Sequence, residues 1–150
     1  MTHRFSIFTL ASLLLLVCVG TSAKKRTFNE AKAIAQRQAT SLGATLSSAS
    51  IETAKRLNAS PATGESRAYY VFPHDKGMGF TIVSGDDLLP EIVGYSDRGT
   101  YDVTKLPDGY KMFLDLYSHL VDDLSHQQSM AVQTASQAQR RSQARPHDPS

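Results

Sequence analysis

The sequence has almost no cysteine, no tryptophan and no strong excess of charge. Its single cysteine, Cys18, lies close to the start, so the rest of the chain has neither a disulfide nor a thiolate ligand for a metal. A secreted domain without disulfides must be stabilised by burial of apolar side chains. Lys and Arg number 16 against 14 Asp and Glu. This near balance argues against a protein that binds nucleic acid through its phosphates.

A hydrophobic run long enough to cross a bilayer is also absent. The longest apolar stretch, residues 5–19, is shorter than the roughly 20 residues that a spanning helix needs. It follows His3 and Arg4, and small residues ending at Ala23 come after it. A basic N-terminal region, an apolar run and small residues at the cleavage site are typical of a secretory signal peptide. We therefore expect residues 1–23 to be removed and the protein to be exported, to the periplasm or the extracellular space.

Two other interpretations compete with a cleaved signal. A membrane anchor would need a longer apolar run, and a lipoprotein would need a small residue before Cys18, where the sequence has Val17. The basic residues Lys24-Lys25-Arg26 follow the predicted cleavage site. We interpret them as a solvated chain end.

The part of the chain that can fold begins with a helix signal. Thr27 precedes Glu30 by three residues, which is the spacing of a capping box. Behind it, apolar residues recur at steps of three and four up to about Leu42, and Gly43 is suited to the position after the helix. This first helix is rich in alanine, so we expect it to pack closely on a flat partner such as a sheet.

Three apolar runs follow, at residues 68–72, 80–84 and 91–96. The first link, residues 73–79, contains two glycines that can adopt positive φ, and the second covers residues 85–90. Links this short make neighbouring strands antiparallel, because a parallel crossover needs a dozen or more residues. The sequence predicts an antiparallel β-meander.

Residues 51–57 fit either an edge strand or a helical turn, and we favour the strand, which would widen the meander. A second helix opens at Pro107 and Asp108 and presents one apolar face. That face consists of Tyr110, Phe113, Leu114, Tyr117, Leu120, Val121 and Leu124. Residues 127–150 have few large apolar side chains, so we expect a flexible polar tail there and a folded domain over residues 24–126. The predicted fold is α+β, a three- or four-stranded antiparallel β-meander with both helices on one face, in the order helix–strands–helix.

Candidate catalytic groups are few. His74, His119, His126 and His147 are spread along the chain. Asp86-Asp87 comes after Ser84-Gly85 in the link between two strands and is interpreted as a turn whose side chains cap the local backbone. We therefore expect no catalytic residue, no cofactor and no metal site.

Motifs in a fixed order carry a family resemblance. Gly79-Phe80-Thr81-Ile82-Val83-Ser84-Gly85-Asp86 is followed by Gly94-Tyr95-Ser96, then by Gly99-Thr100-Tyr101-Asp102, Leu106-Pro107 and Phe113-Leu114. In this order they resemble the prodomain of streptopain-type cysteine peptidases, a module that also occurs alone as the Spi protease inhibitor. The resemblance covers roughly residues 27–124.

The resemblance implies a function without catalysis. The papain-like catalytic domain that follows this module in the family is expected to be missing, so the chain would bind a streptopain-type peptidase in trans and cover its active-site cleft. The family's cleft-binding loop maps onto Leu106, Pro107, Asp108, Gly109 and Tyr110. Family members often carry an asparagine near the position of Gly109, and this sequence does not. We expect a monomer that binds no nucleic acid and, after signal cleavage, no membrane.

Two alternatives stay open at this point. One is a prodomain remnant that folds but inhibits nothing, and the other is a secreted module that binds another ligand through its sheet face. The first would follow from an interrupted peptidase gene, and the second requires an uncovered sheet face.

Overall fold

The structure, a computed structural model, describes residues 24–59 and 67–143. Its elements are the helices α2 (Phe28–Ser41), α3 (Ser48–Leu57) and α4 (Asp108–Gln143), the strands β1 (Tyr69–Pro73), β2 (Phe80–Ser84) and β3 (Ile92–Ser96), and the short 3-10 helix η1 (Asp75–Gly77). The predicted α+β class and its helix–strands–helix order are confirmed. The predicted signal peptide, residues 1–23, lies outside the described residues.

The three strands form one antiparallel sheet in the order β1-β2-β3. Val71 pairs with Ile82, and Ile82 pairs with Gly94, so β2 is the central strand. In the link between β1 and β2, Gly77 and Gly79 have φ values of 67° and 104°, in the region that glycine alone adopts freely. The predicted β-meander is confirmed.

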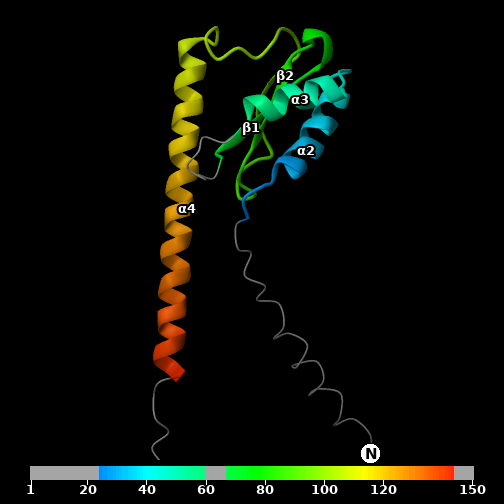
Figure 1. Ribbon diagram of the computed structural model, residues 1–150. Helices are drawn as coiled ribbons and strands as arrows, with labels where there is room; N and C mark the ends of the chain where they lie inside the picture. Colours follow the sequence, from blue (N-terminus) through cyan, green and yellow to red (C-terminus); the bar gives the residue numbers. More distant parts are fainter. Residues whose placement is uncertain (1–23, 60–66, 144–150) are drawn as a thin grey trace, which may run out of the picture.

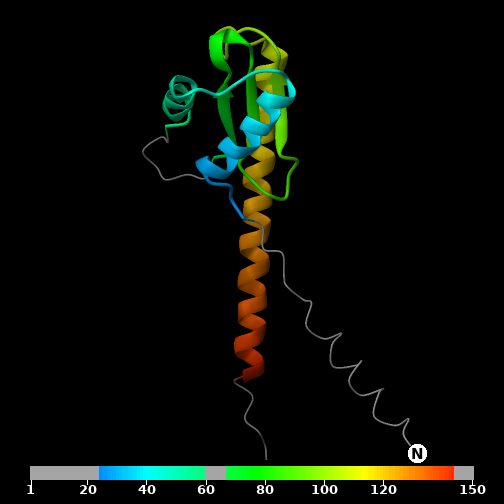
Figure 2. The same ribbon diagram turned by 90° about the vertical axis from the view of Figure 1, so that its right-hand side faces the viewer.

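Helices α2 and α3 cover one face of this sheet, and α4 covers the opposite face (Figures 1 and 2). Phe72 and Val83 point to one face and pack with buried residues of α2 and α3. Val71 and Ile82 point to the other face and pack with Leu114 of α4. The prediction that both helices share one face is therefore wrong. Each face of β2 carries large apolar side chains and all five of its residues are buried, so each face needs its own cover.

Helix α2 begins as the sequence predicted. The Glu30 amide donates to the Thr27 hydroxyl at 3.3 Å, and the Thr27 amide donates to the Glu30 carboxylate at 2.7 Å, which completes the capping box. Ala31, Ala35 and Ala39 have no exposed surface. These small side chains allow the helix to approach the sheet closely.

Residues 51–57 belong to helix α3, so the predicted edge strand is wrong. The helix begins after Ser47, whose hydroxyl accepts from the Ser50 amide. The buried Asn58 side chain then takes the place of a neighbouring strand. It accepts from the Val71 amide at 2.9 Å and donates to the Val71 carbonyl at 2.7 Å. A single amide side chain thus satisfies both backbone groups of Val71 on the open edge of β1, which an added strand would otherwise have done.

Helix α4 continues through Gln143, where the sequence analysis expected a flexible tail. At about 1.5 Å per residue its 36 residues extend about 54 Å, and its second half runs past the sheet (Figure 1). Residues 129–143 are exposed, yet Gln, Ala, Met and Arg favour helix without burial. The predicted flexible tail was based only on the lack of large apolar side chains, and not on the helix propensity of these residues. No helix within residues 24–59 and 67–143 has the length and apolar character needed to cross a membrane.

Candidate functional site

The entry loop, defined as residues 106–110, consists of the two residues that precede α4 and the first three residues of that helix. Leu106 and Tyr110 are partly buried and pack against the core cluster of Val71, Phe80, Ile82 and Leu114. Between them, Pro107, Asp108 and Gly109 are exposed. The structure therefore fixes both ends of the predicted cleft-binding segment and presents its middle to solvent.

Backbone hydrogen bonds fix the conformation of the entry loop. The amides of Tyr110 and Lys111 both donate to the Pro107 carbonyl, at 2.9 and 3.0 Å. Asp108 is the first residue of α4, where the helix dipole favours a negative charge. Its side chain is fully exposed and has one weak contact, to the Lys111 ammonium at 3.5 Å. A segment held this rigidly loses little conformational entropy when it binds a partner.

Tyr69 and Tyr101 are neighbours of Tyr110, the last residue of the entry loop. Burial, with the neighbouring Tyr69 phenol as a second cause, raises the pKa of Tyr101 to about 12. Burial, and again Tyr69, raises the pKa of Tyr110. The phenols of Tyr101 and Tyr110 are therefore neutral at physiological pH. The packing of the entry loop against the core does not depend on pH in that range.

An exposed apolar stripe on α4 continues from the entry loop. Met112, Phe113, Leu116 and Leu120 are between 42% and 63% exposed. Positions 112, 116 and 120 are four residues apart and share one face of the helix. Phe113 and Leu120, which the sequence analysis assigned to the buried face, thus lie at its exposed margin. Apolar side chains grouped in this way are typical of protein-binding surfaces.

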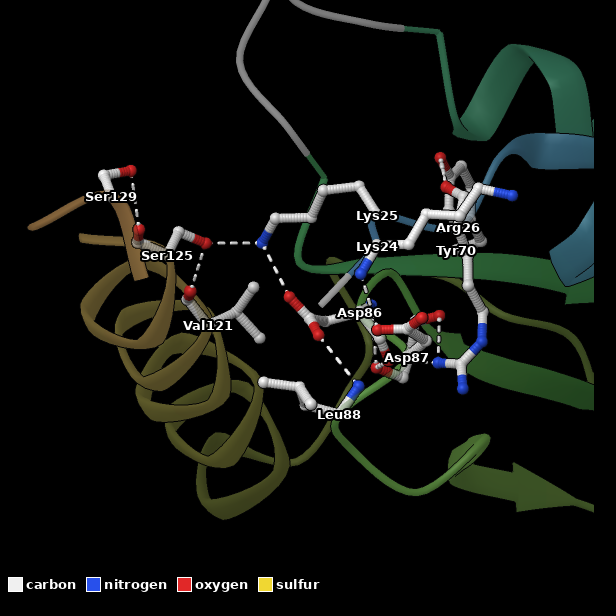
Figure 3. A network of polar contacts seen from close by, with 11 residues as sticks. Lys24, Lys25, Arg26, Tyr70, Asp86, Asp87, Leu88, Val121, Ser125 and Ser129 are labelled. Carbon is white, nitrogen blue, oxygen red and sulfur yellow. Dashed lines mark hydrogen bonds and ion pairs between the residues drawn. The ribbon is translucent and has the colours of Figure 1, made fainter. Parts of the chain in front are cut away.

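Away from the entry loop, a cluster of polar contacts joins the start of the described chain to α4 (Figure 3). The Asp86 carboxylate is 1% exposed, and its Oδ2 lies 3.0 Å from the Lys25 ammonium. That ammonium also donates to the Ser125 hydroxyl of α4. Asp86 Oδ1 accepts from the Leu88 amide at 2.9 Å, which confirms its predicted capping role. The interpretation of Lys24-Lys25-Arg26 as a solvated end is wrong, because Lys25 and Arg26 are held against the turn after β2.

This ion pair was not predicted, because the basic cluster and the acidic pair lie far apart in the sequence. Three basic residues at one position and two adjacent acids at another were a signal for it. Only the fold shows that Lys25 and Asp86, 61 positions apart, are neighbours.

His74 has a structural environment. It is 3% exposed, and its two ring nitrogens lie 3.1 Å from the Met78 carbonyl and 2.9 Å from the Thr81 hydroxyl. A carbonyl only accepts, so Nδ1 is the donor and Nε2 can accept from Thr81. His119 and His126 lie exposed on α4, whereas His147 is outside the described residues. Within the described part of the chain, no three His, Asp or Glu side chains are grouped to hold a metal ion.

Comparison with known protein families shows which family this chain belongs to. The sequence pattern of the Spi protease inhibitor family matches residues 23–121, most of the chain. The chain belongs to this family. The match includes the entry loop and ends at Val121, so the projecting half of α4 lies beyond the family pattern. The predicted resemblance is confirmed.

A larger protein is similar to this Spi-family chain. The thiol protease/hemagglutinin PrtT of Porphyromonas gingivalis is 30% identical over 111 residues, which make up 74% of the present chain. The chain spans only 13% of the length of that relative. No solved structure matches.

Proposed function

We propose that this chain is an exported, non-catalytic inhibitor of a streptopain-like, papain-type cysteine peptidase. It binds the enzyme in trans and places Pro107, Asp108 and Gly109 of the entry loop in the active-site cleft. The observation that carries the proposal is the entry loop itself, a segment within the family match that is anchored at both ends and exposed in the middle.

The type of target is supported by the chemistry that the relative's name states. A thiol protease uses a cysteine nucleophile, and the matched segment of PrtT is a small part of that protein. A chain similar to one segment of a thiol protease is suited to bind an enzyme of the same chemical class.

The apolar stripe supplies the second part of the proposed interface. A short loop alone buries too little area for stable binding, since specific interfaces bury about 800 Å² per partner. Met112, Leu116 and Leu120 continue from the entry loop along one side of α4. Together they give the peptidase a rigid apolar surface next to the inserted loop.

The two faces of the sheet weigh against a different binding module. Helices α2 and α3 cover one face and α4 covers the other. An uncovered sheet face, which that alternative requires, is not available.

The test uses residues 24–150 and a streptopain-type peptidase with a chromogenic peptide substrate. We expect inhibition at micromolar protein or below. Asp108→Arg should raise the inhibition constant at least about tenfold, which corresponds to about 1.4 kcal/mol, because a long cationic side chain replaces a short one inside the cleft. Asp123→Arg makes the same charge change at an exposed position on the same helix and should inhibit like the unaltered chain.

Unchanged substrate cleavage at micromolar protein would remove the proposal and favour the remnant. Equal effects of Asp108→Arg and Asp123→Arg would show that inhibition does not use the entry loop.

A further inference from the structure

The first three described residues pair with the turn after β2 through an isolated antiparallel bridge. The Arg26 amide donates to the Gly85 carbonyl at 2.8 Å, and the Asp87 amide donates to the Lys24 carbonyl at 3.2 Å. Lys25 and Asp86 face each other in an antiparallel bridge. The segment that directly follows the predicted cleavage site is therefore part of the fold.

The side chains of these three residues are already engaged. The Lys24 ammonium lies 2.7 Å from Glu30, and the Lys25 ammonium lies 3.0 Å from Asp86. The Arg26 guanidinium donates to backbone carbonyls of the turn, those of Ser84, Asp86 and Leu89. Among the described ion pairs, none of these cations takes the carboxylate of Asp87.

The carboxylate of Asp87 instead meets the backbone nitrogen of Lys24. The distance from that nitrogen to Asp87 Oδ1 is 2.7 Å (Figure 3). In a chain that still includes Ala23, the nitrogen is a neutral amide with one hydrogen. Hydrolysis of the Ala23–Lys24 peptide bond adds hydroxide from water to the Ala23 carbonyl and a proton to the Lys24 nitrogen. The resulting amine takes up a further proton near neutral pH and becomes an ammonium.

We propose that Asp87 is the acceptor for the α-ammonium of Lys24, which cleavage after Ala23 creates. The amide contact of the uncleaved chain then becomes an ion pair at the same atom, with a charge-assisted hydrogen bond. The family match begins at residue 23, next to the bond whose hydrolysis would create this end. The proposal concerns processing and attachment of the chain start, and it does not rest on the proposed inhibition.

The consequence is that cleavage strengthens the attachment of the chain start to the body. Lys24 contacts the first turn of α2 through Glu30 and the turn after β2 through Asp87. The adjacent Lys25 reaches α4 through Ser125. A chain cut at a bond before Ala23 would place its α-ammonium ahead of Lys24 and would retain only the amide contact.

The first experiment determines the chain start. The full sequence is expressed in a bacterium that exports it, and the intact mass of the exported product is measured. A mass that corresponds to a start at Lys24 is expected. A start at any other residue would overturn the proposal.

The second experiment measures the ion pair. Residues 24–150 are prepared with a free amine by removing a fusion partner without leaving extra residues, and the α-amino pKa is measured by NMR after ¹³C-dimethylation. We expect Asp87→Asn to lower this pKa by about half a unit, since an exposed ion pair contributes up to about one kcal/mol and one unit corresponds to 1.36 kcal/mol. Asp123→Asn, at an exposed site on α4, should leave it unchanged.

A matched pair of longer and shorter chains completes the test. Residues 22–150, whose amine is displaced by two residues, should show no dependence of the α-amino pKa on Asp87. If the α-amino pKa of residues 24–150 is the same with and without the Asp87→Asn substitution, the proposal is overturned. Both altered side chains are exposed, so each variant is expected to fold.

Discussion

The hydroxyl of Tyr110 lies against Gly94, so closely that a methyl group on Gly94 would be 2.6 Å from it. Gly94 is in β3 and Tyr110 ends the entry loop. Because Gly94 has no side chain, the Tyr110 hydroxyl can lie directly against β3. This close contact sets the position of the entry loop relative to the sheet.

Gly94→Ala is expected to weaken inhibition more than it weakens the fold. Its φ is not in the left-handed region, so alanine suits the strand, and the only close contact is the movable end of Tyr110. The tyrosine must shift and the start of α4 with it. We expect the inhibition constant to rise several-fold, while the urea midpoint changes little.

The control is Tyr110→Phe combined with Gly94→Ala. Removal of the hydroxyl leaves room for the methyl group, so the double variant should inhibit like Tyr110→Phe alone. If Gly94→Ala has the same effect with and without the hydroxyl, the contact does not position the loop.

Lys25→Met is expected to lower the free energy of unfolding by about 1–3 kcal/mol. Loss of one partner of a fully buried ion pair costs about 3–5 kcal/mol, and the one-third exposure of Lys25 reduces this. Asp86→Asn should cost less, because the freed Lys25 can reach water whereas a freed Asp86 carboxylate cannot. Urea denaturation measures both, with Lys32→Met as the matched control. A larger loss for Asp86→Asn than for Lys25→Met would contradict this account.

Asn58→Ala is expected to destabilise the protein by about 1–3 kcal/mol, because it leaves the amide of Val71 without its partner on the edge of the sheet. Hydrogen exchange at Val71 should accelerate together with the loss of stability. Asn29→Ala changes the same residue type at an exposed helix position and should have little effect. Unaltered exchange at Val71 in Asn58→Ala would disprove the role assigned to this side chain.

Stability should depend on Asp75 in a pH-dependent manner. Hydrogen bonds from Ser47, Ser50 and Thr45 hold the pKa of its carboxyl well below its usual range. A lowered folded-state pKa gives stability that is fully present above the unfolded value, about 3.9, and is lost as the pH falls below it. Asp75→Asn should therefore be less stable than the unaltered chain at pH 7, and the difference should shrink below about pH 4.

The comparison is made with urea titrations from pH 7 to pH 2. Asp123→Asn, on an exposed part of α4, should show no such trend. A constant difference between Asp75→Asn and the unaltered chain over this range would mean that the carboxylate charge is not what the three donors stabilise.

Local patterns in the sequence were sufficient for the elements whose signals are local. The capping box at Thr27 and Glu30 and the short links between strands depend on residues a few positions apart, and both are present in the structure. The position of the entry loop also followed from sequence, because its motif lies within the family pattern. Its exposure did not follow, since that depends on Leu106 and Tyr110 finding a core cluster made by the sheet.

The amino-acid sequence by itself determined the α2 cap, the antiparallel meander and the apolar character of both sheet faces, because backbone hydrogen bonding and side-chain alternation act over short distances. Only the tertiary structure decided that α4 covers the face opposite α2, that Asn58 replaces a strand beside Val71, and that Lys25 meets Asp86. Each of these joins residues that are distant in the chain or chooses between two equally apolar faces. Such choices depend on how the whole chain packs.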